Sequence, residues 1–444
     1  MIVPSAKLMF WTAMVLVPFA FLAAVVPGAA GIACLGIGGL LLVALVDAFV
    51  GRQNLGGVGV EIPPVTRMSK DREAKLNLRL QNTGKRSRLV RVGLAWPREI
   101  QSPVETLDAQ LPADVEWSHL PWSCVPLKRG NYKFDLAYVE IASPIGLWAV
   151  RKKVPVQAEL RVYPNVLKER NSLAALFLNR GQFGLHAQRQ VGKGRDFEKL
   201  REYVPGDGYD EIHWKATARR GKPITKVFQI EKTQEVYVIV DASRLSARPA
   251  SENGTGDPIL ERFVTAALVL GMAAEKQHDL FGLLTFTNRV ERFVRAKNGS
   301  AHYNTCRNAL YELQPQVVTP DFDEVCTFIR LRLRRRALLI FLTALDDPTI
   351  AESFVRNVEL LRRQHLVLVN MVPPQGVKPL FTDQNVTATD DLYQELGGHL
   401  RWEKLRELQK VLQRRGVRFS LLEQERLCAD LVAQYLNIKQ RQLL

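Results

Sequence analysis

Two long apolar stretches open the chain, with a Pro-Gly turn between them. Residues 8–26 contain no charged side chain, and a second uncharged run begins at residue 29 and continues to Asp47. Each run approaches the roughly 20 residues that cross the hydrocarbon core of a bilayer. The pattern predicts a transmembrane helical hairpin over residues 1–52, with helices at about 8–26 and 29–50.

Charges that flank the hairpin predict its orientation. Lys7 precedes the first run and Arg52 follows the second, while the turn between them contains neither Lys nor Arg. Because positive flanks stay in the cytoplasm, we expect a multi-pass protein whose soluble part is cytoplasmic. The alternative is a cleaved signal peptide, since the first run ends in small residues suited to cleavage. Even then, the second run would stop translocation of the chain across the membrane, and the bulk of the chain would remain in the cytoplasm.

Residues 53–165 alternate apolar and polar side chains with a period of two, as in AKLNLRLQN. This period is typical of half-buried strands. Turn-forming sequences such as NTGK, KRGN and SPIG separate successive runs. Several short strands at this spacing predict a β-sandwich, immunoglobulin-like in type. Its tryptophans are expected in the core: Trp96, Trp117, Trp122 and Trp148.

From residue 235 to residue 444, apolar strands alternate with amphipathic helices. EVYVIVDAS is a near-continuous apolar run, as expected for a strand buried on both faces. Helical stretches then separate the strand-like runs LFGLLTFT, ALLIFLTAL, HLVLVNMV and VRFSLLE. This alternation predicts an α/β domain with a doubly wound, mainly parallel sheet. Ligands of such sheets bind at the carboxyl ends of the strands.

Oxygen-bearing side chains follow several of these strands. Asp241 ends the first strand and Ser243 follows it, while Thr319, Thr343 and Asp346 come after later elements. Carboxylate and hydroxyl oxygens gathered there would suit a hard cation such as Mg²⁺. The alternative, which we prefer on composition alone, is that these residues cap the helices that begin after the strands. The other candidates of this kind are Ser246, Asp321 and Asp347.

The formal net charge of +16 favours an acidic partner. The run RLRLRRR, from Arg330 to Arg336, concentrates this charge but has few aromatic residues to stack on bases. We therefore expect a solvated face or contact with an anionic membrane surface rather than with nucleic acid. Five scattered cysteines without a C-x-x-C argue against a disulfide framework or a zinc site. Nucleotide-binding and hydrolase motifs are absent, so any ATP-driven step must come from a partner.

A charged segment, GRDFEKLREYVPGDGYDEIHWKATARRGK, directly precedes the first strand of the α/β domain. PGDG predicts a tight turn, and WKATARRGK predicts a short helix ended by Gly221. The mixed charges suggest internal ion pairs. Its apolar side chains are expected to pack against the sheet as a flap: Phe197, Leu200, Tyr203 and Trp214. Residues 166–234 then form a segment that leads into the sheet.

This segment, together with RGNYKFDLAYVEIASPIGLW upstream, resembles the signature of the bacterial family named domain of unknown function 58. The resemblance implies a bacterial inner-membrane protein with two N-terminal helices, a β-sandwich and a domain like von Willebrand factor A. The matching positions are Arg201, Tyr203, Pro205, Gly206, Asp207, Ile212, Trp214, Ala218 and Arg219.

Domains like von Willebrand factor A often carry a metal-ion-dependent adhesion site, D-x-S-x-S with a Thr and an Asp on later loops. Asp241 and Ser243 match the start of that motif, but Leu245 takes its third place and Ala344 stands where the later Asp is usual. The resemblance therefore implies a degraded site at most, with Mg²⁺ doubtful. Its ligands would be Asp241, Ser243, Thr319 and Asp346.

The family resembles cofactors of MoxR-type AAA+ ATPases that act in the assembly or maturation of protein complexes. The resemblance implies a membrane-anchored, cytoplasm-facing scaffold or adaptor, without enzymatic activity or a confirmed cofactor, whose signature residues contact the ATPase. One alternative is a membrane-associated hydrolase or transferase at the strand ends, which the missing nucleophile–base pair weakens. A second alternative, nucleic-acid binding, rests on the charge alone.

Overall fold

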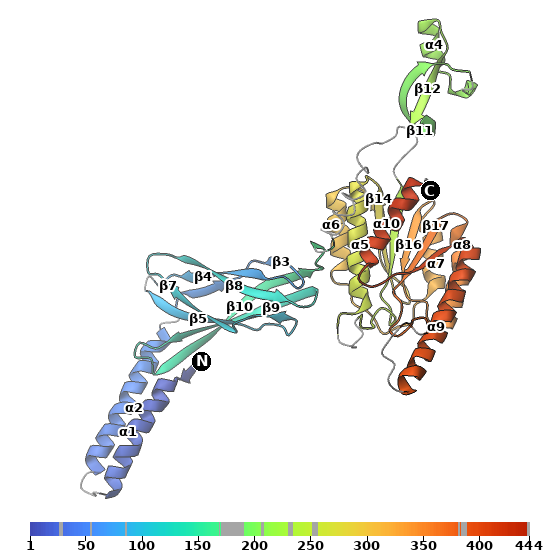
Figure 1. The fold of residues 1–444 in the computed structure, drawn as a ribbon. Helices are drawn as coiled ribbons and strands as arrows, with labels where there is room; N and C mark the ends of the chain where they lie inside the picture. Colours follow the sequence, from blue (N-terminus) through green and yellow to red (C-terminus); the bar gives the residue numbers. More distant parts are fainter. Residues whose placement is uncertain are drawn as a thin grey trace. The chain divides into compact units, whose positions relative to one another are not determined.

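The computed structural model forms two compact units, Met1–Asn165 and Val166–Leu444 (Figure 1). The structure describes the whole chain except for a few short segments and one longer stretch. These are residues 26–29, 54–55, 85–86, 168, 170–190, 206–207, 230–233, 251–255, 381, 383–388 and 442–444.

The two apolar runs form helices α1 (Ala6–Val25) and α2 (Ala30–Gln53). Both helices are long and apolar enough to cross a membrane. Most of their side chains face outward; Phe21 is 71% exposed and Leu35 is 78% exposed. Such surfaces suit contact with lipid, because nothing else in this unit covers them among the described residues.

The β-rich residues form two mostly antiparallel sheets that share one core, as expected for the predicted β-sandwich; its immunoglobulin-like character stays a prediction. One sheet has the order β1–β10–β9–β5–β7, with β3 added in parallel to β10, and the other has the order β2–β4–β8–β6. The strands are β1 (Ile2–Pro4), β2 (Val58–Glu61), β3 (Val65–Ser69), β4 (Ala74–Asn82), β5 (Arg88–Leu94), β6 (Ile100–Gln101), β7 (Thr106–Leu111), β8 (Trp117–Pro126), β9 (Gly130–Ala142) and β10 (Trp148–Tyr163).

Tryptophans of the sandwich differ in their burial. Trp122 is fully buried and meets Trp96 edge to face, with ring centroids 5.5 Å apart. Trp117, expected in the core, is instead 40% exposed. It lies on the same strand as Trp122 but at odd spacing from it, so its side chain points to the other face of the sheet.

A buried carboxylate joins the helical hairpin to the sandwich. Asp47, near the end of α2, is only 2% exposed. It accepts hydrogen bonds from the Ser143 hydroxyl and from the backbone N–H groups of Ile145 at 3.0 Å and Leu147 at 3.1 Å. These donors all belong to the turn between β9 and β10. A single side chain of α2 therefore fixes that turn against the base of the hairpin.

Further contacts from both ends of the hairpin complete this joint. Strand β1, just before α1, pairs antiparallel with the start of β10. Ser5 donates from its hydroxyl to the Gly146 carbonyl at 2.6 Å, and Trp148 donates from Nε1 to the Ala44 carbonyl at 2.7 Å. Both ends of the hairpin thus contact the same end of the sandwich, so the hairpin and the sandwich form one unit.

The second unit contains a six-stranded sheet in the order β15–β14–β13–β16–β17–β18 (Figure 1). Neighbouring strands pair in parallel except for β14 and β15. The strands are β13 (Glu235–Asp241), β14 (Leu280–Phe286), β15 (Val290–Lys297), β16 (Leu338–Leu342), β17 (Leu366–Met371) and β18 (Arg418–Leu421).

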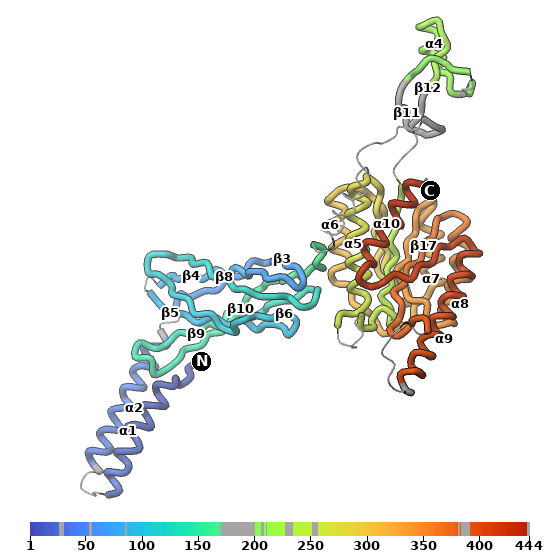
Figure 2. Tube along the Cα trace, in the orientation of Figure 1, coloured from blue at the N-terminus to red at the C-terminus, as the bar shows by residue number. Residues whose placement is uncertain are grey.

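Helices cover both faces of this sheet (Figure 2). Val238 and Val240 of β13 pack into the core that α5, α6 and α10 cover, while Tyr237 and Ile239 pack under α7, α8 and α9. Burial on both faces explains the continuous apolar strands; likeness to von Willebrand factor A stays a prediction. The helices are α5 (Ile259–Lys276), α6 (Ser300–Leu310), α7 (Phe322–Arg332), α8 (Pro348–Arg362), α9 (Thr389–Arg414) and α10 (Leu427–Gln440).

The family-signature segment forms a small element of its own, which we call the signature arm. It consists of β11 (Val191–Glu202) paired antiparallel with β12 (Ile224–Gln229), and of helix α4 (Trp214–Arg220) in the connection between them. The short helix that the sequence predicts is therefore present, and Gly221 ends it at φ 67°, a left-handed conformation that glycine adopts without strain.

Replacing Asp47 tests the joint between the hairpin and the sandwich. Asp47→Ala leaves the Ser143, Ile145 and Leu147 donors without their acceptor, so we expect a loss of about 3 kcal/mol of stability in the first unit. Thermal unfolding of the full chain in detergent, followed by tryptophan fluorescence, measures this loss. Asp114→Ala, at an exposed acid of the sandwich, is the control; equal melting of the two variants would contradict the role of Asp47.

Candidate functional site

The carboxyl edge of the parallel sheet places Asp241 at the end of β13, fully buried. Thr343 donates its hydroxyl to one carboxylate oxygen at 2.6 Å, and the Ser243 N–H donates to the other at 2.8 Å. Burial raises the pKa of Asp241, while these hydrogen bonds and the charge of Arg248 act in the opposite direction. The structure thus brings Asp241, Ser243 and Thr343 together, as the strand ends predicted.

The carboxylate that was expected to complete a cation site, that of Asp346, forms an ion pair with an arginine. Arg248 donates to both oxygens of Asp346, at 2.7 and 3.0 Å, in a bidentate ion pair. Sequence reasoning did not find this arginine, although it lies only seven residues after Asp241. Bidentate pairs of this kind are among the stronger hydrogen-bonded interactions of side chains, so Asp346 is committed to Arg248.

The remaining positions of the expected adhesion site do not supply ligands. Leu245 is 2% exposed and Ala344 is 5% exposed, and both pack in the core under α7, α8 and α9. Thr319 is exposed, although the Arg244 N–H brings its loop close by donating to the Val318 carbonyl at 3.0 Å. In the described part of the chain no group of three or more His, Cys, Asp or Glu residues is placed to hold a metal.

These residues do not fit a divalent cation. An oxygen-seeking ion needs several ligands that are not already paired, whereas Asp241 and Asp346 are both engaged and two positions are apolar. Helix capping accounts for two further candidates: Asp321 accepts from backbone N–H groups at the start of α7, and Asp347 does the same at the start of α8. The capping interpretation is confirmed for these two residues but not for Asp241.

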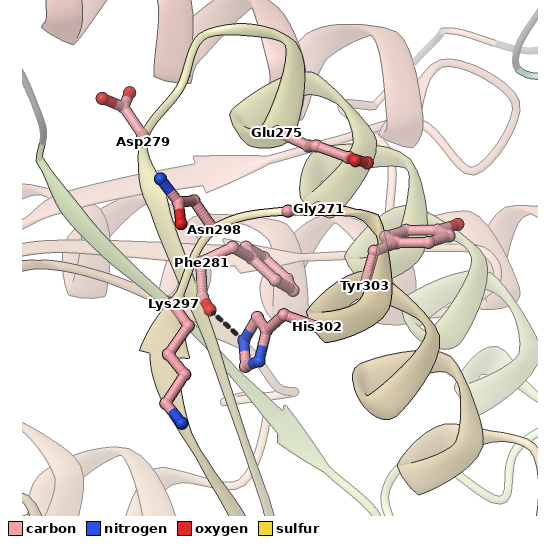
Figure 3. A pocket seen from close by; sticks show the side chains of 9 residues that line it. Gly271, Glu275, Asp279, Phe281, Lys297, Asn298, His302 and Tyr303 are labelled. Atoms are coloured by element: carbon pink, nitrogen blue, oxygen red, sulfur yellow. Dashed lines mark hydrogen bonds between the residues drawn. The ribbon is translucent and has the colours of Figure 1, made fainter.

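A second cluster, shown in Figure 3, lies between α5, the start of β14, the end of β15 and α6. His302 Nε2 is 2.8 Å from the Phe281 carbonyl oxygen and 3.6 Å from the sulfur of Cys306. Because a carbonyl only accepts, Nε2 carries the proton and cannot act as a base toward the thiol. Burial also raises the pKa of Cys306 to about 12, so this pair has no activated nucleophile.

Acidic and basic side chains around this cluster do not converge on one point. In Figure 3, Lys297, Asp279 and Glu275 point in different directions. Asp279 is fully buried and holds α10 in place: it accepts from the Lys439 ammonium at 2.8 Å, from the Tyr435 hydroxyl and from the Gln234 N–H. This carboxylate has a structural role.

Trp214 and Leu200 of the signature arm are exposed and Tyr203 is half-buried, which corrects the prediction that these side chains pack on the sheet as a flap. Trp214 is 68% exposed, Tyr209 is 77% exposed and Leu200 is 40% exposed. The physical reason is that the arm covers its own small interior with Ile212 and Ile224 instead. The side chain of Phe197 and the whole of Gly206 and Asp207 lie outside what the structure describes.

Local hydrogen bonds hold α4 in position on the arm. His213 caps the helix: its Nδ1 accepts from the Ala216 N–H at 3.0 Å. The Thr217 hydroxyl accepts from the Ile224 N–H at 3.0 Å, and the Tyr203 and Tyr209 rings stack with centroids 6.3 Å apart. His213 is therefore a helix cap rather than a base.

Basic signature residues lie on the same arm. Arg219 is exposed on α4, and Arg201 of β11 pairs in register with Thr225 of β12. Pro205 is exposed before the segment at residues 206–207. Internal ion pairs were expected here, and among the described residues of the arm Lys222 and Glu202 form one, at 3.7 Å.

The fold defines the class of chain: an apolar helical hairpin is followed by an antiparallel sandwich and an α/β domain that carries an exposed arm. The model of the family described as "Protein of unknown function DUF58" matches residues 199–380, from the arm through most of the α/β domain. This match confirms, over residues 199–380, the resemblance seen in the signature.

Two solved structures are similar to part of the chain. An aerotolerance-related membrane protein from Bacteroides fragilis, carrying multiple mutations to serines, shares 12% identity over 47% of this chain and 99% of that one, with a TM-score of 0.31. The conserved hypothetical protein BatB from Bacteroides thetaiotaomicron shares 12% identity over the same proportions, with a TM-score of 0.29. These likenesses are too weak to support a function. The comparison with curated proteins gives no match.

Replacing Asp241 tests whether its charge serves the fold or a ligand. Burial raises the folded-state pKa of Asp241 above 3.8, so the contribution of this residue to stability is lost as the pH rises above 3.8 and through the folded-state pKa. We expect Asp241→Asn to melt at least as high as wild type in alkaline buffer, with an advantage that shrinks as the pH falls. Added Mg²⁺ should leave both melting temperatures unchanged.

Glu352→Gln, at an exposed carboxyl of α8, controls for the loss of one negative charge. A Mg²⁺-dependent rise in the wild-type melting temperature that Asp241→Asn abolishes would show that a cation binds at Asp241 after all.

Proposed function

We propose that the chain is a membrane-anchored, cytoplasm-facing adaptor whose signature arm binds another protein. The partner we propose is a MoxR-type AAA+ ATPase acting in the assembly or maturation of protein complexes. One observation supports the proposal above the others: Trp214 and Tyr209 are exposed on a small, locally ordered arm.

Exposed aromatic side chains on a rigid support are typical of binding hot spots. Tryptophan, tyrosine and arginine dominate the binding energy of protein interfaces, because they bury large areas and also form polar contacts. Trp214, Arg219 and Arg220 all lie on α4 and are all exposed. A surface of this composition suits a partner with an apolar pocket and an acidic rim.

Order within the arm favours binding without a large loss of entropy. The His213 cap, the Thr217–Ile224 hydrogen bond and the left-handed Gly221 fix both ends of α4. A recognition helix that is already formed loses little conformational freedom on binding, so more of the contact energy appears as affinity. This preorganisation supports a docking role for the arm.

Chemistry elsewhere in the chain also supports an adaptor. Asp346 at the carboxyl edge is paired with Arg248, and Cys306 in the separate cluster on α6 is a buried thiol beside a protonated histidine nitrogen. The sequence has no nucleotide-binding motif, so an ATPase partner would supply the energy for any remodelling. We extend the family resemblance to the sheet itself and propose that it is a domain like von Willebrand factor A.

Membrane anchorage is part of the proposal. Helices α1 and α2 have the length and composition of membrane spans, and Lys7 and Arg52 flank them on the side of the sandwich. We propose that the chain spans the bacterial inner membrane twice, with the sandwich and the α/β domain in the cytoplasm.

Trp214→Ala tests the docking role of the arm. Because this side chain is largely exposed, we expect a melting temperature within about 2 °C of wild type, as for most surface substitutions. Binding to the cognate ATPase in a pull-down from detergent should fall by an order of magnitude or more, roughly 1.4 kcal/mol per factor of ten. Trp117→Ala, at an exposed tryptophan of the sandwich, is the matched control and should bind normally. Full binding by Trp214→Ala would remove the arm from the interface.

A reporter fused after Leu444 tests the orientation. An enzyme that is active only in the cytoplasm should be active at this position, because both charged flanks of the hairpin favour that side. The control is the same fusion to a chain that begins after α1, which changes the number of spans. Activity of a periplasm-specific reporter on the full chain would overturn the topology.

A further inference from the structure

Parallel pairing brings three helix ends to one edge of the α/β sheet. Strands β16, β17 and β18 are neighbours and run in the same direction, so all three begin at the same edge. Helices α7, α8 and α9 each end a few residues before one of these strands begins. Their last turns and the loops that follow therefore gather at the amino edge of the sheet, opposite the edge that carries Asp241.

This amino edge is strongly cationic. The stretches 330–336, 356–363 and 410–418, which we call the cationic edge, hold twelve Lys or Arg residues and a single acidic residue, Glu359. Glu359 pairs with Arg415 at 2.9 Å, and Arg415 is the one basic residue of these stretches that is partly buried; the others are exposed. The rest of the positive charge faces outward.

Helix termini alone do not explain so much charge. Basic residues in the last turn of a helix interact favourably with its dipole, but this effect falls off within that turn. Arg334, Arg335 and Arg336 follow the end of α7 at Arg332. Like charges this close repel one another, so an anionic group placed among them would be attracted and would lower that repulsion.

Exposed aliphatic side chains accompany the arginines. Leu331 is 72% exposed, Leu360 is 42% exposed and Val411 is 40% exposed. One belongs to each of the three helices, and each lies in or next to the last turn. Aliphatic side chains interleaved with long basic ones suit the boundary between lipid headgroups and acyl chains, where the aliphatic groups insert and the charges reach phosphates.

A site for single-stranded nucleic acid would be expected to have a different amino-acid composition. Proteins that bind single strands stack bases on aromatic side chains, and the cationic edge contains no Phe, Tyr or Trp. Arg332 of the cationic edge does lie over an aromatic ring, with its guanidinium 5.6 Å from the centroid of the Phe328 ring. That ring is partly buried against the core and is not offered to a base.

We infer that the cationic edge is a second membrane-binding site of the chain, which takes anionic phospholipid headgroups. The inference rests on the proposed membrane anchorage, because the hairpin would keep the α/β domain near a bilayer. Docking of this edge would place the opposite edge, with Asp241, away from the lipid.

Lipid-dependent quenching tests this site on the full chain. The chain is reconstituted in lipid discs, with Cys34 replaced by Ala because it is the exposed cysteine, and a fluorophore is attached at Leu331→Cys. Discs contain brominated lipid with either neutral phosphatidylcholine or anionic phosphatidylglycerol. We expect quenching several-fold stronger in anionic discs, and we expect high salt or the double variant Arg334→Glu, Arg335→Glu to abolish that increase.

Val317→Cys is the matched control. Val317 is an 89% exposed apolar residue at the opposite edge, where the neighbouring Gln316 N–H donates to the Ala242 carbonyl just after β13. A label there should not be quenched. Equal quenching at both positions, or quenching at Leu331→Cys that is the same in neutral and anionic discs, would overturn the inference.

Further outcomes separate this inference from the proposed function. Chains that insert into the discs but show no quenching at Leu331→Cys would contradict the lipid site alone. Chains that fail to enter the discs at all would contradict the anchorage on which the proposed function depends. If a single-stranded oligonucleotide binds through Arg334 and Arg335 while lipid causes no quenching, the edge is a nucleic-acid site instead.

Discussion

Parallel pairing of the central strands is the constraint that determines which side chains lie at each edge of the α/β sheet. Because β13, β14, β16, β17 and β18 run in one direction, the ends of these five strands lie at one edge of the sheet and their starts lie at the other. The first edge collects Asp241, Thr343 and the Arg248–Asp346 pair. The second collects the arginines that follow α7, α8 and α9. At the first edge the carboxylates of Asp241 and Asp346 are paired within the domain, whereas most basic side chains of the second edge are exposed.

A single buried carboxylate has the corresponding role in the first unit. Asp47 follows the uncharged stretch of α2, near the end of that helix. Its three hydrogen bonds hold the turn between β9 and β10. The sandwich therefore continues rigidly from the hairpin instead of hanging from a flexible linker. For an adaptor this rigidity is useful, since a fixed base limits the positions that attached binding elements can reach.

Periodicity predicted the elements well because it reports which side of an element is buried. The uncharged runs, the two-residue alternation of AKLNLRLQN and the continuous apolar EVYVIVDAS each became the expected element. Pairings between distant residues could not be read this way: Asp47 meets Ser143, and Arg248 meets Asp346, almost a hundred positions apart. Trp214 was misplaced because an aromatic residue is usually buried, and its identity alone does not distinguish a core side chain from one displayed for a partner.

Site-specific photo-crosslinking would test the central claim, that the signature arm binds a partner protein, most directly. A photoreactive amino acid replaces Trp214 in the full chain, which is expressed in cells that contain the cognate AAA+ ATPase and irradiated there. The account predicts a covalent adduct with the ATPase, absent when the same amino acid replaces the exposed Trp117. Crosslinks from position 214 only to the chain's own α/β domain would show that the arm folds back on the sheet, and would contradict the account.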